Sequence, residues 1–292
     1  MKNWKEVYKL LQNSPEWNKL EKYLKDFDEK KSFKVEDIWN TMNRVWDDMG
    51  LDNKYYDSEH LSKYYSHPVW FLNGLFIETD RESMRHRKLI AGYFKNKENL
   101  KILDYGGGFG TLAKEIVKSS PSSQVDIYEP YASKYAYENI QEFKNIKIVN
   151  NLKENYYDVL VNTDILEHVE KPIELIAIYN KCLKKGGMII SHWNFTPCIK
   201  GHLPKHFHFR YTFNRIVPLL GFTKEIKNER HGHFFKKIRN IRIEDLDKAY
   251  KREKYSKLIY PLNIVGDKIK KIIVIILKKL AIYDLVKRVI KR

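Results

Sequence analysis

An acidic residue followed by a run of glycines is the clearest chemical signal in this sequence of 292 residues. Asp104 precedes a loop with glycine at positions 106, 107, 108 and 110. Glycines between a strand and a helix let the backbone approach a ligand closely and adopt dihedral angles that other residues avoid. Glu129 follows Asp104 by 25 residues and ends the next predicted strand, where nucleotide-binding sheets place a carboxylate against ribose hydroxyls. Loop, spacing and acid together predict a site for a nucleotide-like cofactor.

Two familiar cofactor patterns do not fit this loop. The dinucleotide pattern G-x-G-x-x-G fails because its third glycine position, counted from Gly106, is Thr111. A phosphate-binding loop fails because no Gly-Lys-Ser or Gly-Lys-Thr follows. The carboxylate of Asp104, directly before the loop, instead suits a cationic ligand whose amino group it holds directly or through water.

The loop resembles motif I of the class I S-adenosylmethionine-dependent methyltransferases, and later segments resemble further motifs of that family in the same order. They are residues 125–130, 150–152, 157–169 with a Leu-Glu-His signature, 183–190, 206–212 and 219–222. The last two resemble the small-molecule or sugar O-methyltransferase branch. The resemblance covers about residues 99–222 and departs from the family at Gly107, where Cys or Ser is commoner; we expect this departure to be tolerated.

The resemblance implies that the cofactor is S-adenosylmethionine. It places Glu129 on the ribose and the segment after the third strand near the adenine. The cofactor-binding residues that it implies are Asp104, Gly106, Gly108, Gly110, Glu129, Pro130, Asn151, Leu152 and Asp164.

Histidines supply the predicted base. Methyl transfer to a hydroxyl needs a group with a pKa near 7 to take the proton, and histidine is the natural choice. His168 follows the fourth predicted strand at the carboxyl edge of the sheet, and His206 and His208 are alternatives that follow the fifth strand. A structural role for His168, as a cap or an indirect cofactor contact, stays open.

The histidines after the fifth strand could serve as an alternative base, bind a sugar or hold a divalent metal, and a metal site is the weaker interpretation. His192, His202, His206 and His208 would need Asp164 or Glu167, because no acidic residue lies between Trp193 and Lys224. This spacing is poor for a metal site, so the sequence predicts none.

Short sequence motifs distinguish methyltransferases that act on different classes of substrate. The (Asp/Asn/Ser)-Pro-Pro-aromatic motif of base-nitrogen methyltransferases has no counterpart in residues 162–165, which contain no proline. Methylation of a base carbon needs a nucleophilic cysteine, for which Cys198 is an isolated candidate. We therefore expect O-methylation of a small molecule or of a sugar or glycan precursor. The alternatives are methylation of nucleic acid or protein, or a non-catalytic membrane-attached binding protein on the same fold.

Strands and helices alternate from Leu100 onward, which predicts an α/β fold with a doubly wound, mostly parallel, seven-stranded sheet. Strands are expected near 101–104, 124–128, 146–149, 157–162 and 188–192, with a closing antiparallel pair at 222–227 and 233–241. A helix from about 172 to 183 is expected to end at Gly186 and Gly187. Residues 1–98 are predicted to form a helical substrate-binding cap, 99–243 the cofactor-binding core and 244–292 a basic tail.

The cap carries two groups with open roles. Charged residues at 80, 81 and 85–87 either line the cleft and hold an anionic substrate or form a solvated helix face. The aromatic group Tyr64, Tyr65, Trp70 and Phe71 either stacks on a sugar or, as we favour, forms the core of the cap.

Positive charge is concentrated at the end of the chain. Of the net charge of +17, residues 224–292 carry 21 Lys or Arg against 8 Asp or Glu. Within 267–292, Ile269, Ile272, Ile273, Ile276 and Leu280 share one helical face, with lysines largely opposite, as in helices that lie on anionic membranes. Packing on the core or in a homo-oligomer is the alternative, and nucleic acid is the least favoured partner. No apolar leader or spanning segment is recognised, and two cysteines suit a reducing compartment, so we expect a cytoplasmic enzyme at the inner membrane face.

Overall fold

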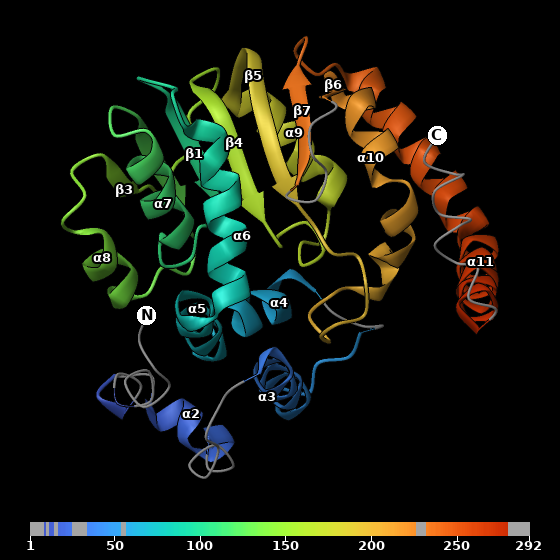
Figure 1. Ribbon diagram of the computed structural model, residues 1–292, viewed down its shortest axis with the longest axis horizontal. Helices are drawn as coiled ribbons and strands as arrows, with labels where there is room; N and C mark the ends of the chain where they lie inside the picture. The colour runs from blue at the N-terminus through green and yellow to red at the C-terminus, as the bar shows by residue number, and fades with distance from the viewer. Residues whose placement is uncertain are drawn as a thin grey trace.

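A mixed sheet of seven strands forms the centre of the protein (Figure 1). The computed structural model describes residues 9, 12–14, 17–24, 34–53, 57–225 and 232–279. The strand order is β3-β2-β1-β4-β5-β7-β6. The strands are β1 (Lys101–Tyr105), β2 (Gln124–Tyr128), β3 (Ile146–Ile148), β4 (Tyr157–Thr163), β5 (Leu183–His192), β6 (Phe222–Glu225) and β7 (His233–Lys237). β1 to β5 run parallel and β7 is antiparallel to both β5 and β6, which confirms the predicted fold class.

Helices cover both faces of this sheet. Ile102 of β1 packs on one face with α6 (Arg81–Ala91) and α7 (Thr111–Ser119). Leu103, the next residue, packs on the other face with α9 (Pro172–Cys182). Alternate residues of a strand point to opposite faces, so β1, whose neighbouring residues Ile102 and Leu103 are both apolar and buried, needs a layer on each side. The remaining elements are α8 (Lys134–Ile140), α10 (Phe213–Ile216) and the short 3₁₀ segments η2 (Gly92–Phe94), η3 (Pro204–Tyr211) and η4 (Val217–Leu220).

The helix after β4 ends earlier than its glycines suggest. α9 stops at Cys182, and β5 begins at Leu183 and continues through Gly186 and Gly187. The predicted bounds of the helix, about 172–183, are therefore confirmed, whereas the expectation that Gly186 and Gly187 stop it is wrong, because both glycines lie in β5. Leu183 pairs with Tyr157 of β4, and the register then shifts, so Gly186, with a φ of 83°, serves an irregularity in the strand rather than a helix cap.

Four N-terminal helices form a layer at the carboxyl ends of the parallel strands (Figure 1). They are α2 (Trp17–Leu24), α3 (Val35–Asp48), α4 (Ser58–Tyr65) and α5 (Val69–Thr79). Their apolar cluster includes Phe109 from the glycine loop and Leu203 from the segment after β5, so the layer is packed on the core. α6 belongs to the predicted cap by sequence but packs on α7 and the sheet instead.

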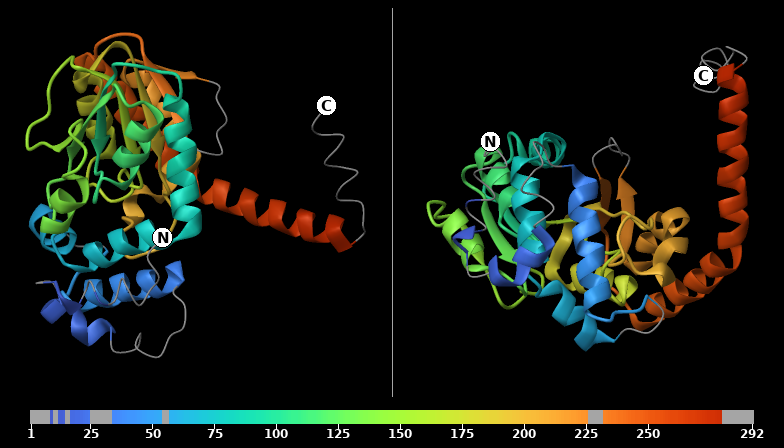
Figure 2. Two further views of the ribbon diagram at one scale, coloured as in Figure 1. Left: turned by 60° about the vertical axis from the view of Figure 1, so that its left-hand side comes forward. Right: turned by 90° about the horizontal axis from the view of Figure 1, so that it is seen from below.

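α11 (Ile243–Lys279) is the last described helix and extends away from the rest of the molecule (Figure 2). Its first part packs on α9, η3 and η4, and Pro261 lies within the helix. Among the described helices, α11 included, none is both long enough and apolar enough to cross a bilayer. Residues 280–292, including Leu280 of the predicted apolar face, lie outside the described residues.

One carboxylate joins the N-terminal layer to the core. Glu78 of α5 accepts hydrogen bonds from Thr111 (3.1 Å), Lys114 (3.1 Å), Tyr135 (2.9 Å) and Asn139 (2.8 Å). Its side chain is only 14% exposed, and burial favours the neutral form. Lys114 and the hydrogen bonds outweigh burial and lower the pKa of Glu78 below its usual 4.5.

Replacing Glu78 should therefore loosen this junction. We expect Glu78→Ala to lower the free energy of unfolding by about 3 kcal/mol, because it leaves the Lys114 ammonium buried without its partner. Since the folded-state pKa is depressed, the contribution of Glu78 is complete above its unfolded pKa and is lost as the pH falls through the folded value. Urea denaturation at neutral and acid pH measures both effects. Glu82→Ala, at an exposed ion pair, is the control and should change stability by less than about 0.5 kcal/mol; equal losses in the two variants would contradict the assignment.

Candidate active site

Several candidate residues lie at the carboxyl ends of the parallel strands, and α4 and α5 lie beyond that edge of the sheet (Figure 1). Asp104 lies within the end of β1, and Glu129 follows β2. Asp164 follows β4, and His192 ends β5. This edge is where open α/β sheets bind ligands, because the loops that connect strands to helices diverge there.

The glycine loop is fitted tightly around Asp104. Gly108 has a φ of 53°, and a Cβ atom there would meet nothing within 4 Å, so the backbone faces open space on this side. A Cβ atom at Gly107 would lie 2.7 Å from Oδ2 of Asp104 and 2.9 Å from Ile127. Gly106 and Gly110 complete the loop. A side chain at position 107 would therefore clash with its neighbours, so this chain requires glycine there. The sequence had led us to expect only that glycine would be tolerated.

Asp104 is a buried carboxyl group within the electrostatic influence of Arg87, which is half-buried. Oδ2 of Asp104 has no hydrogen-bond partner among the described residues. Burial raises the pKa of Asp104 to about 7, opposed by the positive charge of Arg87 on α6. An unpartnered carboxylate oxygen beside a guanidinium suits a ligand that carries both an ammonium and a carboxylate. The methionine part of S-adenosylmethionine carries these two groups, so the residues present fit this cofactor.

Glu129 is held by the glycine loop itself. Its Oε2 accepts a hydrogen bond from the backbone N–H of Gly108 (3.0 Å), and its Oε1 accepts one from Tyr131 (3.3 Å). Burial raises the pKa of Glu129, and these two hydrogen bonds oppose that shift. Pro130 is exposed beside it. Glu129 is thereby fixed next to Gly108, where a carboxylate can accept from sugar hydroxyls.

Asn151 and Leu152 lie in the loop between β3 and β4. Asn151 is exposed, and Leu152 is half-buried against the apolar cluster on the α9 side of the sheet. No described contact joins either residue to the glycine loop, so their predicted place beside the adenine stays a prediction.

Asp164 makes its closest contact with a histidine. Its Oδ1 lies 2.7 Å from Nδ1 of His192, and its backbone N–H donates to the His192 carbonyl (3.0 Å). Asp164 has a φ of 56°, an uncommon backbone conformation for a residue other than glycine. Burial opposes both charges, but the hydrogen bond raises the pKa of His192 and lowers that of Asp164, to which Arg87 and His86 also contribute.

His168, the expected base, is enclosed by other side chains. Its ring lies 4.7 Å from the ring of His202, 5.4 Å from Trp70 and 5.8 Å from Tyr65. Burial, together with the charge of His202, lowers the pKa of His168 to about 3. Half-buried Tyr65 and Trp70 thus pack on His168, whereas Tyr64 and Phe71 are buried in the core of the N-terminal layer.

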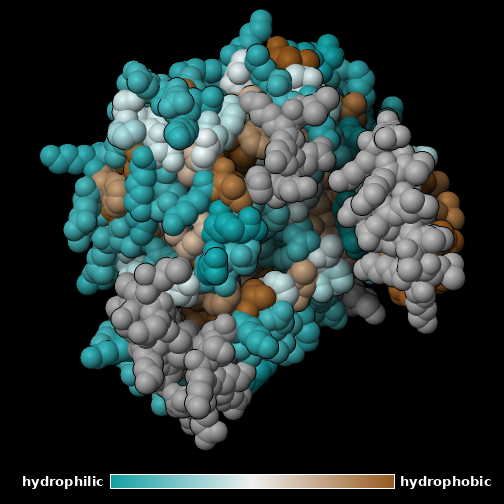
Figure 3. Space-filling view, viewed as in Figure 1, coloured by the Kyte–Doolittle hydropathy of each residue, from teal (hydrophilic) through white to brown (hydrophobic). Residues whose placement is uncertain are grey.

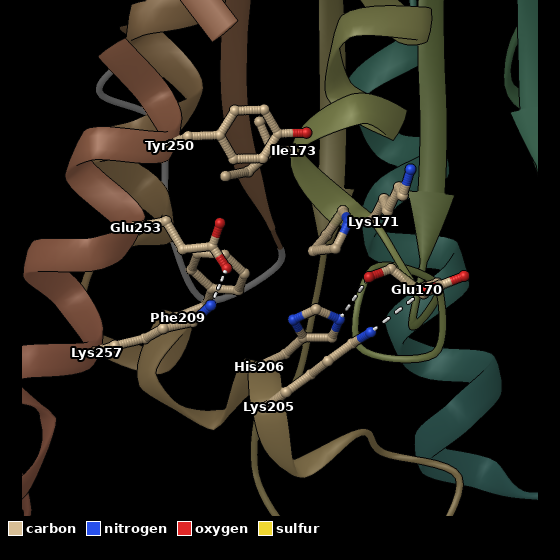
Figure 4. Close-up of a pocket in the computed structure, with 10 residues that line it drawn as sticks. Glu170, Lys171, Ile173, Lys205, His206, Phe209, Tyr250, Glu253 and Lys257 are labelled. Carbon is tan, nitrogen blue, oxygen red and sulfur yellow. Dashed lines mark hydrogen bonds and ion pairs between the residues drawn. The ribbon is translucent and has the colours of Figure 1, made fainter. Parts of the chain in front are cut away.

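His206 and His208 lie on η3, against α11. Nε2 of His206 lies 3.0 Å from the carbonyl of Val169, and Nδ1 of His208 lies 2.8 Å from Oγ of Ser256 on α11. His206 lines a cavity of about 200 Å³ between η3, the start of α9 and α11, together with Lys205 and Glu253 (Figure 4). Burial lowers the pKa of His206 to about 3 and that of His208 to about 4. The described contacts of both histidines are with this packing, not with Asp104 or Glu129.

Comparison with known proteins identifies the fold and the family. Residues 76–236, more than half of the chain, match a family model described as a methyltransferase domain. The chain belongs to this methyltransferase family. Its cofactor is S-adenosylmethionine, and the predicted class of enzyme is confirmed. The match begins within α5 and includes α6, in agreement with the packing of α6 on the sheet.

The chain is also similar to solved structures, at low sequence identity. A methyltransferase from Aquifex aeolicus is 15% identical, covering 62% of this chain and 97% of its own, with a TM-score of 0.44. A didemethyltoxoflavin N1-methyltransferase from Burkholderia thailandensis is 14% identical, covering 62% and 88%, also with a TM-score of 0.44. A comparison of this chain with curated protein sequences found no match.

The pairing of Asp164 with His192 was missed by sequence reasoning. Asp164 was expected at the cofactor, and His192 was one of four histidines expected to act as an alternative base, to bind a sugar or to hold a metal, without Asp164 as the partner of a base. The available signal was the strand order, because β4 and β5 are parallel neighbours in which Thr163 is level with His192. A residue just after β4 must then lie beside the end of β5.

Substitution at Gly107 tests the loop geometry. We expect Gly107→Ser to weaken binding of S-adenosylhomocysteine by at least about tenfold, because its Cβ displaces Asp104 or Ile127. Isothermal titration calorimetry measures the affinity. Gly92→Ala is the matched control, since a Cβ atom there meets nothing within 4 Å, and it should bind normally. Unchanged affinity in Gly107→Ser would show that the loop adapts.

Proposed function

We propose that this methyltransferase transfers a methyl group to a hydroxyl of a small molecule or of a sugar or glycan precursor, with His192 as the general base. The observation that carries the proposal is the 2.7 Å contact between His192 and Asp164, at the same edge as Asp104 and Arg87. When bound, S-adenosylmethionine supplies a methyl group already activated on a sulfonium. The protein needs only to align the acceptor and take its proton.

The pairing supports His192 as a base for two reasons. A carboxylate only accepts hydrogen bonds, so Nδ1 of His192 carries the proton shared with Asp164, and Nε2 is left to accept another. Asp164 also favours the imidazolium that forms when that proton is taken. The His192 side chain is 38% exposed, so an acceptor can approach it.

His168 is less suited to this task. A base with a pKa of about 3 has little affinity for a proton at neutral pH, and the enclosing rings of Tyr65, Trp70 and His202 limit access to it. His206 and His208 have similarly lowered pKa values; His206 contacts the carbonyls of Val169 and Glu170, and His208 contacts Ser256 of α11. Of the predicted bases, none has the combination of exposure, an orienting carboxylate and a raised pKa that supports His192.

The role of His192 can be tested by its titration and by turnover. We expect His192→Gln to lower kcat by about 10²–10⁴-fold on a panel of hydroxylated sugars and phenols while S-adenosylhomocysteine binding is retained. Turnover of the native chain should rise with pH through the raised pKa of His192, and Asp164→Asn should lower that pKa and move the rise to lower pH. NMR titration of the imidazole follows the same pKa without an acceptor.

The control for this test is His60→Gln, an exposed histidine on α4, which should keep both turnover and pH profile. Normal turnover in His192→Gln would transfer the role to His168. Absence of turnover on every hydroxyl acceptor, with cofactor bound, would favour the non-catalytic binding protein or another acceptor class.

We also propose that α11 attaches the enzyme to an anionic lipid surface. Leu258, Leu262, Val265, Ile269 and Ile276 are spaced so that they share one helical face, and each is about half exposed or more. Asp267 faces the body of the protein instead, where Tyr211 donates a hydrogen bond to it (2.5 Å). The apolar stripe therefore points away from the core, and hydrophobic surface is visible where α11 lies, at the right edge of Figure 3.

The charges beside this stripe favour lipid over a second copy of the helix. Between positions 258 and 279 the charged residues are five lysines and Asp267, which is engaged by Tyr211. Two such helices side by side would bring lysines together, whereas anionic head groups would neutralise them. A half-exposed apolar stripe flanked by lysines is the pattern of a helix lying in a membrane interface.

Vesicle sedimentation tests this attachment. The full chain should bind vesicles that contain phosphatidylserine and not vesicles of phosphatidylcholine alone, and Ile269→Asn/Ile276→Asn should reduce binding at least about tenfold. Ile178→Asn, an exposed isoleucine on α9, is the control and should bind normally. Undiminished binding by the double variant would reject the proposal. A concentration-dependent dimer of the native chain that the double variant abolishes would assign the stripe to a second copy instead.

A further inference from the structure

Three buried side chains with metal-ligating atoms meet near the carboxyl ends of β4 and β5. Glu167 and His168 follow β4, and His202 comes from the segment after β5. One ligand atom from each lies within 4.8 Å of the others, and all three side chains are buried. We propose that Glu167, His168 and His202 bind a divalent transition-metal ion.

Both histidines are oriented as metal ligands are. Nδ1 of His168 lies 3.1 Å from the carbonyl of Gly201, and Nδ1 of His202 lies 2.6 Å from the carbonyl of Thr196. A carbonyl oxygen can only accept, so each Nδ1 carries a proton and each Nε2 keeps its lone pair. Metal-binding histidines commonly donate their other ring N–H to a backbone carbonyl in this way, because it fixes the tautomer and the ring orientation.

Glu167 supplies the charge that such a site needs. Its Oε1 accepts a hydrogen bond from the backbone N–H of Asn194 (2.8 Å), which fixes the carboxylate. Its Oε2 is buried and has no hydrogen-bond partner among the described residues. A buried carboxylate oxygen without a donor is costly, and a cation held jointly with two neutral imidazoles would compensate for it.

The surroundings hold these ligands in place. The hydroxyl of Tyr65 lies 3.0 Å from the carbonyl of His168 and 3.2 Å from that of Gly201, bridging the two ligand-bearing segments. Tyr65 and Trp70 pack against the His168 ring and form an apolar wall. Side chains of α4 and α5 thus hold the ligand-bearing segments in place, although these helices are distant in the sequence from Glu167, His168 and His202.

The ligand set indicates the kind of ion. Imidazole suits Zn²⁺, Fe²⁺ and Co²⁺ better than Mg²⁺ or Ca²⁺, which prefer oxygen ligands. Two histidines and one glutamate leave at least one coordination position open, as in catalytic rather than structural sites. This inference concerns ion binding and is independent of the base assigned to His192, which is outside the three ligands.

Metal titration of the chelator-stripped full chain tests the site with the ion alone. We expect one equivalent of Co²⁺ or Zn²⁺ to bind, by visible absorption for Co²⁺ and by calorimetry for Zn²⁺. Glu167→Gln and His202→Asn should each weaken binding by more than about 100-fold, since losing a ligand exceeds the loss of an outer partner. His192→Asn, at the neighbouring histidine, should bind as the native chain does.

Two measurements separate ligation from a structural role. Binding of S-adenosylhomocysteine shows whether each variant is folded, and it does not depend on methyl transfer. In His202→Cys the bound Co²⁺ should gain a thiolate charge-transfer band, which a merely structural change would not produce. The proposal is overturned if the native chain binds no ion, if folded Glu167→Gln keeps its affinity, or if that band does not appear.

Discussion

The carboxylate of Glu78 is the interaction on which the arrangement of the active edge depends. It accepts hydrogen bonds from side chains of α7 and α8, the two helices that follow the glycine loop and Glu129. Glu78 itself belongs to α5, whose other residues pack on the loop through Phe109. One buried anion therefore fixes where the N-terminal layer lies relative to the cofactor loop, and with it the positions of Tyr65 and Trp70.

Charges at the carboxyl edge stabilise one another, and they range from the fully buried carboxyl of Asp104 to the half-exposed side chains of Asp164 and His192. Arg87 lies near both Asp104 and Asp164, and Asp164 in turn holds His192. Removing solvent raises the cost of every isolated charge and strengthens every pair, so a polar network of this kind is either well satisfied or strongly destabilising. Asp104 and Glu167 are the exceptions, each with an unpartnered carboxylate oxygen, and both lie where a cationic group is expected.

The elements were predictable where the local pattern was strong. The strand at 101–105, the glycine loop and the order of later strands follow from apolar runs, glycines and spacing, which act over a few residues. The end of α9 near position 183 was predicted as well, but the place of Gly186 within β5 was not, because the pairing of Leu183 with Tyr157 outweighs the local preference of Gly186. Likewise α6 reads as part of a cap, and only the apolar cluster that it shares with α7 places it on the sheet.

By itself the sequence determined the class of enzyme, since a cofactor loop is a local motif whose glycines and acid are adjacent in the chain. It also determined the amphipathic, basic character of α11, which is periodic. Only the tertiary structure decided which histidine meets a carboxylate, because His192 and Asp164 come together through the pairing of β4 and β5. The same holds for Glu167, His168 and His202, and for the apolar stripe of α11, whose outward direction depends on the contact between Tyr211 and Asp267.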